Sequence, residues 1–139
     1  MTEIVIDNHS VQVVNSFKLL GIHIDNYLSF ENQVAEIKRS VNKKLYSLKR
    51  LKFLSLSTEI YFFKCFILPN FDYCSSIYLF FNKKLIEILN KFFNLCLYRL
   101  LNINVFDMDI LNQKEFLLRF NILPLKMRFF VKIAKFYLK

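Results

Sequence analysis

The hydrophobic residues change their spacing once along this chain, near residue 29. Up to residue 25 they alternate in short β-branched runs, at residues 4–6, 11–14 and 20–24. Alternation of this kind, interrupted by polar turn residues, is typical of short strands. We therefore expect two or three strands in a hairpin or meander. Gly21, the only glycine, lies inside the third run and is expected to mark a bulge or a close backbone approach.

From residue 30 the spacing becomes helical. Apolar residues recur at steps of three or four, at Phe30, Val34, Ile37, Val41, Leu45, Leu48 and Leu51. With Ser29 as the N-cap, this pattern predicts one long amphipathic helix of about six turns. At 100° per residue, the face opposite Val41 carries polar and charged side chains. These are Asn32, Glu36, Arg39, Lys43, Tyr46 and Arg50.

The rest of the chain is also expected to be helical, because one Gly and two Pro in 139 residues leave little material for tight turns. A second helix is expected from a cap at Ser57 to residue 68, with a break at Pro69 and a short helix over 71–79. Further helices are expected over 83–101, 108–120 and 125–139, the last with Pro124 at its start. The segment 83–101 is apolar around most of its circumference, so it lies in the middle of the packing or against protein that is absent. The predicted fold is mainly α: a short β-hairpin or meander followed by a bundle of about five helices.

Few residues suggest catalysis. His9 and His23 have no third metal ligand nearby, and Asp107 with Asp109 is a weak magnesium pattern that is better explained as charge at a helix start. The three cysteines, Cys65, Cys74 and Cys96, have no metal-ligand spacing and are expected to be reduced and buried.

The charge distribution points instead to a polyanion. The net charge of +9 is concentrated in residues 31–54 and 122–139. On the long helix, Arg39, Lys43 and Arg50 share a face with Tyr46, and further lysines flank them. Cations of this kind can neutralise backbone phosphates, and a tyrosine can stack on a base or pack on a sugar. The candidate nucleic-acid-binding residues are Arg39, Lys43, Tyr46, Arg50, Lys38 and Lys49, with Lys44 and Lys52 on the flanks. A solvated helix face is the alternative, and it applies more strongly to the terminal stripe of Arg128, Lys132, Lys135 and Lys139.

An ordered series of motifs runs through the chain. It begins with SFKLLGIHIDNYLSFENQV and a Lys-rich helix, EIKRSVNKKLYSLKRLKFL. It continues with IYFFKCFILPNFDYCSSIY and LIEILNKFFNLCLYRLL, and it closes on ILNQKEFLLRFNILPLKMRFFVKIAKFYLK. This order resembles the region after the catalytic palm in reverse transcriptases of non-LTR retrotransposons, of the LINE or jockey type. The sequence departs from the family pattern at residues 30–33, where Trp and His are usual, and at residues 72–74.

The resemblance implies that residues 1–28 are palm-edge strands and that residues 29–139 form the helical thumb and its C-terminal extension. The family's Asp-Asp hairpin does not occur in this sequence, so we expect no enzymatic activity from this chain alone. No cofactor is expected in it, because magnesium would belong to the missing palm. The implied partners are the backbone of an RNA or DNA duplex and the missing palm and fingers. The implied location is intracellular, in the nucleus or the cytoplasm.

Two other functions fit the sequence. One is a helical protein-interaction module without a nucleic-acid role, in which the apolar excess marks a partner interface. The other is a small membrane protein that spans the bilayer with residues 60–81, although Lys64, Pro69 and Asp72 within that stretch argue against it.

Overall fold

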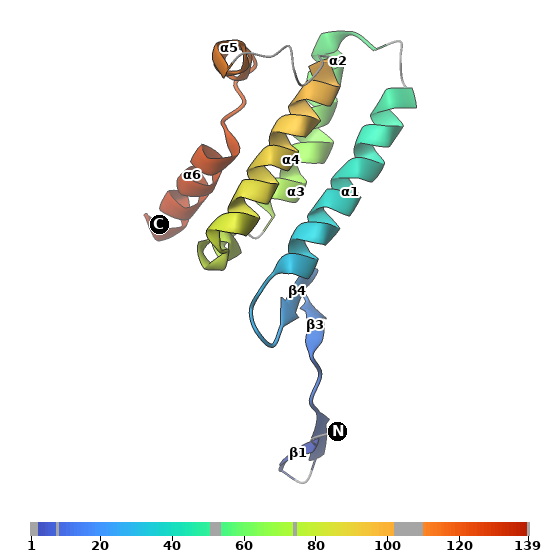
Figure 1. The fold of residues 1–139 in the computed structure, drawn as a ribbon, viewed down its shortest axis with the longest axis vertical. Coiled ribbons are helices and arrows are strands. Elements are labelled where there is room, and N and C mark those ends of the chain that lie inside the picture. The colour runs from blue at the N-terminus through green and yellow to red at the C-terminus, as the bar shows by residue number, and fades with distance from the viewer. Residues whose placement is uncertain (1–2, 8, 51–53, 74, 102–109, 139) are drawn as a thin grey trace.

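The computed structural model describes residues 3–7, 9–50, 54–73, 75–101 and 110–138. Helices dominate the molecule, and short antiparallel strand pairs precede them (Figure 1). The predicted fold class is confirmed: the chain is mainly α, with an N-terminal β region followed by a helical bundle.

The N-terminal β region consists of two separate hairpins. In the first, β1 (Glu3–Ile6) pairs with β2 (His9–Gln12), and in the second, β3 (Ser16–Leu19) pairs with β4 (Ile22–Asp25). The described residues thus form four strands where two or three were expected. The first hairpin projects away from the helices, whereas β4 packs against α1 (Figure 1).

Gly21 lies in the turn of the second hairpin and not in a bulge. Leu20 and Gly21 have φ values of 47° and 83°, so both residues are in the left-handed region that a tight two-residue hairpin turn requires. The turn is held to the helices by Tyr73, whose hydroxyl donates a hydrogen bond to the Leu20 carbonyl. The predicted third run, residues 20–24, thus supplies the turn and most of β4, and β3 is a strand that lies before it.

Helix α1 (Glu31–Arg50) closely follows the predicted range, but its cap differs from the prediction. Phe30, with φ of 56°, immediately precedes the helix, and its carbonyl accepts from the Val34 N–H. Asp25 organises the junction by accepting from the N–H groups of Ser29 and Phe30 and from the Ser29 hydroxyl. Phe30 therefore occupies the N-cap position that was predicted for Ser29, and Ser29 lies one residue before it.

The predicted break at Pro69 is wrong. Helix α2 (Leu56–Phe62), a π-helical turn η1 (Phe63–Ile67) and α3 (Leu68–Asp72) follow one another without interruption. The π turn lets the Leu68 N–H reach the Phe63 carbonyl, and the Asn70 amide donates to the carbonyls of Phe66 and Ile67 at 2.7 and 2.9 Å. These bonds satisfy carbonyl groups of the π turn, just before the position where proline lacks an N–H, and the helix continues through Pro69.

Two smaller predictions also change. The N-cap of α2 is Ser55, whose hydroxyl accepts from the Thr58 N–H, and not Ser57. Residues Ser75–Phe80 form a 3-10 helix, η2, in place of the expected α-helix over 71–79. Helix α4 covers Lys83–Leu101 as predicted, α5 covers Ile110–Arg119, and α6 covers Leu125–Tyr137 with Pro124 as its N-cap.

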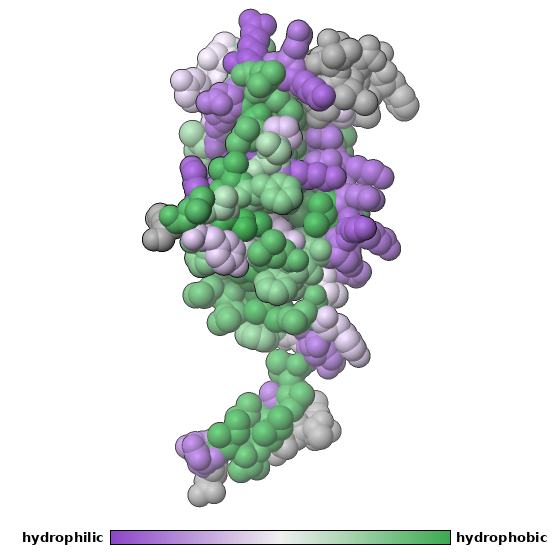
Figure 2. Space-filling view, turned by 90° about the vertical axis from the view of Figure 1, so that its left-hand side faces the viewer, coloured by the Kyte–Doolittle hydropathy of each residue, from purple (hydrophilic) through white to green (hydrophobic). Residues whose placement is uncertain are grey.

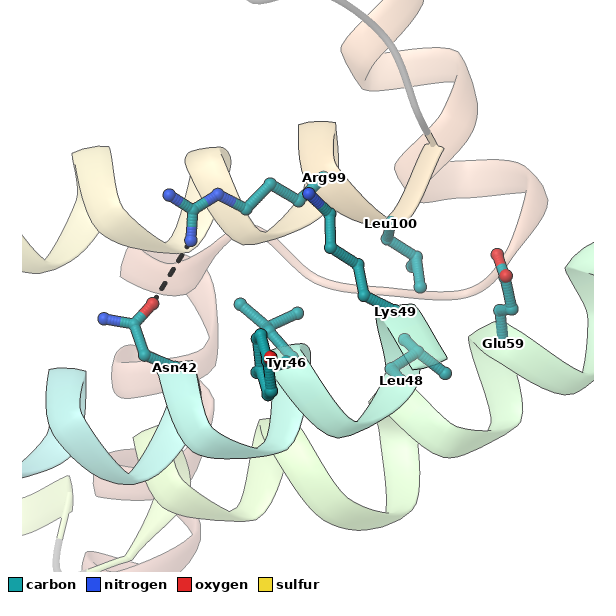
Figure 3. Close-up of a pocket in the computed structure, with 8 residues that line it drawn as sticks. Asn42, Tyr46, Leu48, Lys49, Glu59, Arg99 and Leu100 are labelled. Carbon is teal, nitrogen blue, oxygen red and sulfur yellow. Dashed lines mark hydrogen bonds between the residues drawn. The ribbon is translucent and has the colours of Figure 1, made fainter. Parts of the chain in front are cut away.

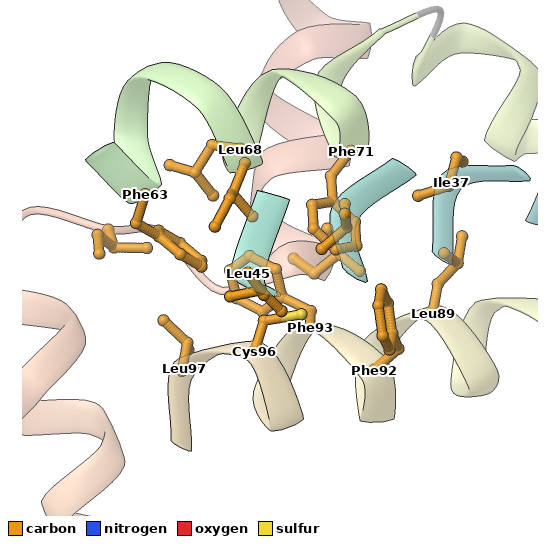
Figure 4. Packing of buried hydrophobic residues seen from close by; sticks show 14 of the residues in the cluster. Ile37, Leu45, Phe63, Leu68, Phe71, Leu89, Phe92, Phe93, Cys96 and Leu97 are labelled. Carbon is orange, nitrogen blue, oxygen red and sulfur yellow. The ribbon is translucent and has the colours of Figure 1, made fainter. Parts of the chain in front are cut away.

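The core lies between α1, the α2–α3 segment and α4, and it is rich in phenylalanine (Figure 4). Phe71 and Phe93 meet edge to face with ring centroids 5.3 Å apart. Helix α4 lies in the middle of the packing, where Leu89, Phe93 and Cys96 are completely buried. Cys65 is exposed, contrary to the expectation of buried thiols, and Cys74 lies outside the described residues.

Candidate nucleic-acid interface

Of the six predicted contact residues, Arg39, Lys43, Tyr46 and Arg50 lie on the outer side of α1, whereas Lys38 and Lys49 lie on its flank towards α4. We call this set of six residues the α1 basic face: Arg39, Lys43, Tyr46, Arg50, Lys38 and Lys49. All are exposed except Lys38, which is half-buried, and the opposite side of the helix supplies Val34, Val41 and Leu45 to the core. The amphipathic pattern therefore presents one row of cations to solvent.

One of these cations already has an acidic neighbour. Arg39 forms an ion pair with Glu36 at 2.7 Å, one turn earlier on the helix. The hydrogen bond between them raises the pKa of Arg39 and lowers the pKa of Glu36. The Arg39 side chain is 66% exposed, so the attraction is weak and a phosphate can compete for the guanidinium.

Two other members of the face rest on aromatic rings. The Arg50 guanidinium lies over the Tyr46 ring at 4.9 Å from the centroid, and Tyr46 is 63% exposed. The Lys38 ammonium lies 5.7 Å from the centroid of Phe92 on α4. Cation–π contacts of this kind hold long side chains in place without neutralising their charge.

The flanking residues differ in their availability. Lys44 turns to the other side of α1 and donates to the Asn70 side chain at 2.8 Å, so it stabilises the contact with α3. Lys52 lies outside the described residues. Neither residue belongs to the α1 basic face.

The terminal cationic stripe is partly used inside the fold. Arg128 forms an ion pair with Asp72 in which both carboxylate oxygens accept, and the Lys132 ammonium lies 3.9 Å from the same carboxylate. Lys135 is exposed, and Lys139 lies outside the described residues. Arg128 therefore anchors α6, which leaves the stripe weaker as a binding surface than the pattern suggested.

A surface cavity of about 460 Å³ adjoins the basic face between α1 and α4 (Figure 3). Asn42, Tyr46 and Lys49 line it from α1, and Arg99 and Leu100 line it from α4, with Glu59 of α2 towards one end. The Arg99 guanidinium donates to the Asn42 amide oxygen at 3.2 Å. Sequence reasoning missed Arg99 because helical spacing relates residues on one helix but not across two.

Other chemistry is not evident in the described part of the chain. No three His, Cys, Asp or Glu residues there are grouped so that they could hold a metal ion. Asp107 and Asp109, the weak magnesium pattern, lie outside it. None of the helices described is long and apolar enough to cross a bilayer, and residues 60–81 are divided among α2, η1, α3 and η2.

A second surface is apolar and lies on the α6 side of the molecule. Figure 2 looks onto this side and shows hydrophobic residues over its middle and lower part, with hydrophilic residues at the top and along one edge. Leu79 and Phe80 of η2 and Phe130 and Phe136 of α6 are exposed. This exposed apolar surface lies on α6 and η2, whereas α4, for which contact with absent protein was one of two expectations, lies in the middle of the packing.

Comparison with models of protein families gave no match, and neither curated proteins nor solved structures gave a significant one.

Proposed function

We propose that this chain is a non-catalytic thumb-region segment of a retrotransposon reverse transcriptase, and that it contacts the phosphate backbone of a nucleic-acid duplex through the α1 basic face. The observation that carries the proposal is the row of solvent-exposed cations on α1: Arg39, Lys43, Lys49 and Arg50. The order of the elements, strand pairs followed by a Lys-rich helix and a bundle, supports the assignment by resemblance.

Contacts to phosphate position a protein on a duplex without reading its sequence. Four exposed cations that neutralise about four phosphates would make the affinity fall steeply with salt, by about 100-fold between about 50 and 200 mM. We therefore expect salt-sensitive, sequence-independent binding to RNA–DNA hybrid and to duplex DNA. Fluorescence anisotropy with labelled duplexes at several salt concentrations measures this slope.

The test replaces Arg39, Lys43 and Arg50 together by Glu. The matched control replaces three exposed lysines on other helices by Glu: Lys114, Lys126 and Lys135. Each change removes two positive units, so both triple variants fall from a net charge of +9 to +3. We expect the first variant to lose duplex binding and the control to retain most of it. Equal losses in the two variants, or an affinity that does not change with salt, contradict the proposal.

The apolar α6 side favours a second function, a protein-interaction module without a nucleic-acid role. Phe130 and Phe136 are 68% and 72% exposed, and exposed apolar patches of this kind mark interaction sites or aggregation-prone surfaces. Under this alternative the wild-type chain shows no salt-sensitive binding to a duplex. Replacing Arg39, Lys43 and Arg50 by Glu then leaves the anisotropy of the labelled duplex unchanged.

A further inference from the structure

The cavity between α1 and α4 has a polar end and an apolar floor. At the polar end, Arg99 and Asn42 face one another across the two helices, and the Lys49 side chain extends towards α4 beside them (Figure 3). Leu45, Leu48 and Leu100 line the apolar part. Its volume of about 460 Å³ lies within the range of small-ligand sites.

The cations in this cavity are available for an anion. Across the residues that the structure describes, neither Lys49 nor Arg99 has a carboxylate within ion-pairing distance. Arg99 uses one N–H group on Asn42, so its guanidinium keeps further donors. An arginine held in this way can present two parallel N–H groups to one phosphate.

The tyrosine gives the cavity an aromatic wall. Arg50 lies over the Tyr46 ring, and the ring also lines the cavity. A tyrosine at the mouth of a cationic cavity provides a stacking surface for a nucleobase, and stacking of this kind is found chiefly with unpaired bases.

The carboxylate at the other end argues against a row of phosphates in the cavity. Glu59 would repel a second phosphate, whereas its oxygens can accept from the N–H groups of a base edge. Cations therefore lie towards one end of the cavity and a carboxylate at the other, with Tyr46 and the leucine floor along it (Figure 3). The phosphate, base face and base edge of a nucleotide can match these three kinds of group.

We propose that this cavity binds one unpaired nucleotide of a nucleic-acid strand, with its phosphate at Lys49 and Arg99 and its base against Tyr46. The inference rests on the proposed function and deepens it, because it adds a single-strand subsite beside the duplex-binding face. Arg99 is then the residue of α4 that completes the interface.

The test compares two labelled RNA–DNA hybrids that differ only in one bulged guanine, with the full 139-residue chain. We expect the bulged hybrid to bind about tenfold more tightly, the lower part of the range for stacking one base on an aromatic side chain. The Tyr46→Ala and Arg99→Gln variants are expected to bind both hybrids with equal affinity. Circular dichroism of each variant confirms that it is folded.

Lys91→Gln is the matched control, since it removes one exposed cation from α4 outside the residues that line the cavity. This variant should keep the preference for the bulged hybrid. Equal affinity of the wild-type chain for the two hybrids overturns the inference, and so does a preference for the bulged hybrid that survives Tyr46→Ala. In either case, salt-sensitive binding to the duplex leaves the proposed function intact. No binding to either hybrid overturns both. Displacement of the bulged hybrid by micromolar guanosine monophosphate would assign the cavity to a free nucleotide and overturn the strand assignment.

Discussion

Replacing Asp72 by Asn should loosen the attachment of α6 to the rest of the bundle. Asp72 ends α3, and Arg128 of α6 donates to both of its carboxylate oxygens, with the Nε–Oδ1 bond at 3.0 Å. The two side chains are only 17% and 16% exposed, so water screens their attraction poorly. The pair is thus the closest charged link between α3 and α6, and the Lys132 ammonium lies 3.9 Å from the same carboxylate.

The magnitude follows from the two bonds. Hydrogen bonds to charged groups each contribute about 1.5–3 kcal/mol, and breaking one partner of a fully buried pair costs about 3–5 kcal/mol. In the Asp72→Asn variant one oxygen still accepts, but the new amide nitrogen faces a guanidinium donor. Because the site is partly exposed, we expect a loss of about 2 kcal/mol in the free energy of unfolding.

Urea unfolding followed by circular dichroism measures the loss. The slope of the free energy of unfolding against urea concentration should stay unchanged. A double-mutant cycle with Arg128→Gln isolates the pair, and we expect a coupling energy of about 1.5 kcal/mol. A loss below about 0.5 kcal/mol, within the range of ordinary surface substitutions, would refute the reasoning. It would mean that apolar packing, such as that between Phe129 and Tyr78 at 4.2 Å between ring centroids, holds α6 by itself.

Two further predictions concern ionisable groups. The N–H of Ser29, together with its hydroxyl and the Phe30 N–H, lowers the pKa of Asp25 below its ordinary value of 3.8. The stability gained from these hydrogen bonds is therefore complete above pH 3.8, and it is lost as the pH falls through the lower pKa of the native state. The urea midpoint of the wild-type chain should therefore drop more steeply below about pH 4 than that of Asp25→Asn, and parallel pH profiles would contradict this. Burial raises the pKa of Cys96 to about 12, so iodoacetamide at about pH 8.5 should alkylate the exposed Cys65 in the native chain and modify Cys96 only after unfolding. Peptide mass mapping distinguishes the two thiols, and equal rates of modification would show that Cys96 is accessible.

The long helices were predictable because each one alone satisfies a helical pattern. The steps of three and four from Phe30 to Leu48 place the buried stripe of α1 correctly, and α4 runs from Lys83 to Leu101 as expected. A stripe of this kind fixes which side chains are buried and therefore which are exposed. For this reason the exposure of Arg39, Lys43 and Arg50 also followed from the sequence.

The errors arise where one residue's effect depends on a neighbour that the periodicity does not show. Proline was expected to end the helix at Pro69, but the π turn and the Asn70 amide satisfy the carbonyl groups around it. The junction before α1 is similar, since Asp25 at the end of β4 accepts from the Ser29 and Phe30 N–H groups and so fixes the chain just before the helix. In both cases a side-chain hydrogen bond overrides a local propensity.

The candidate site was predictable only along α1. Arg99 enters through the packing of α4 against α1, and its contact with Asn42 joins residues 57 positions apart. The pairing of Arg128 with Asp72 is equally long-range, and it removes from the terminal stripe a cation that the sequence alone counted as free. Pairings across the bundle require the tertiary structure.

Helix α4 separates the two surfaces from which the two functions are argued. One flank carries Arg99 beside the α1 basic face, whereas the other flank, at Ile86, lines an apolar cavity with Phe129 and Phe130 of α6. The buried stripe of α4 lies between the two surfaces. A substitution on one surface therefore leaves the residues of the other surface in place. Loss of duplex binding after charge reversal on α1 therefore tests the nucleic-acid function without altering the apolar α6 side. The Asp72→Asn variant instead measures how strongly α6 is attached to α3. The two functions can be judged separately because the fold keeps their residues on different sides of one helix.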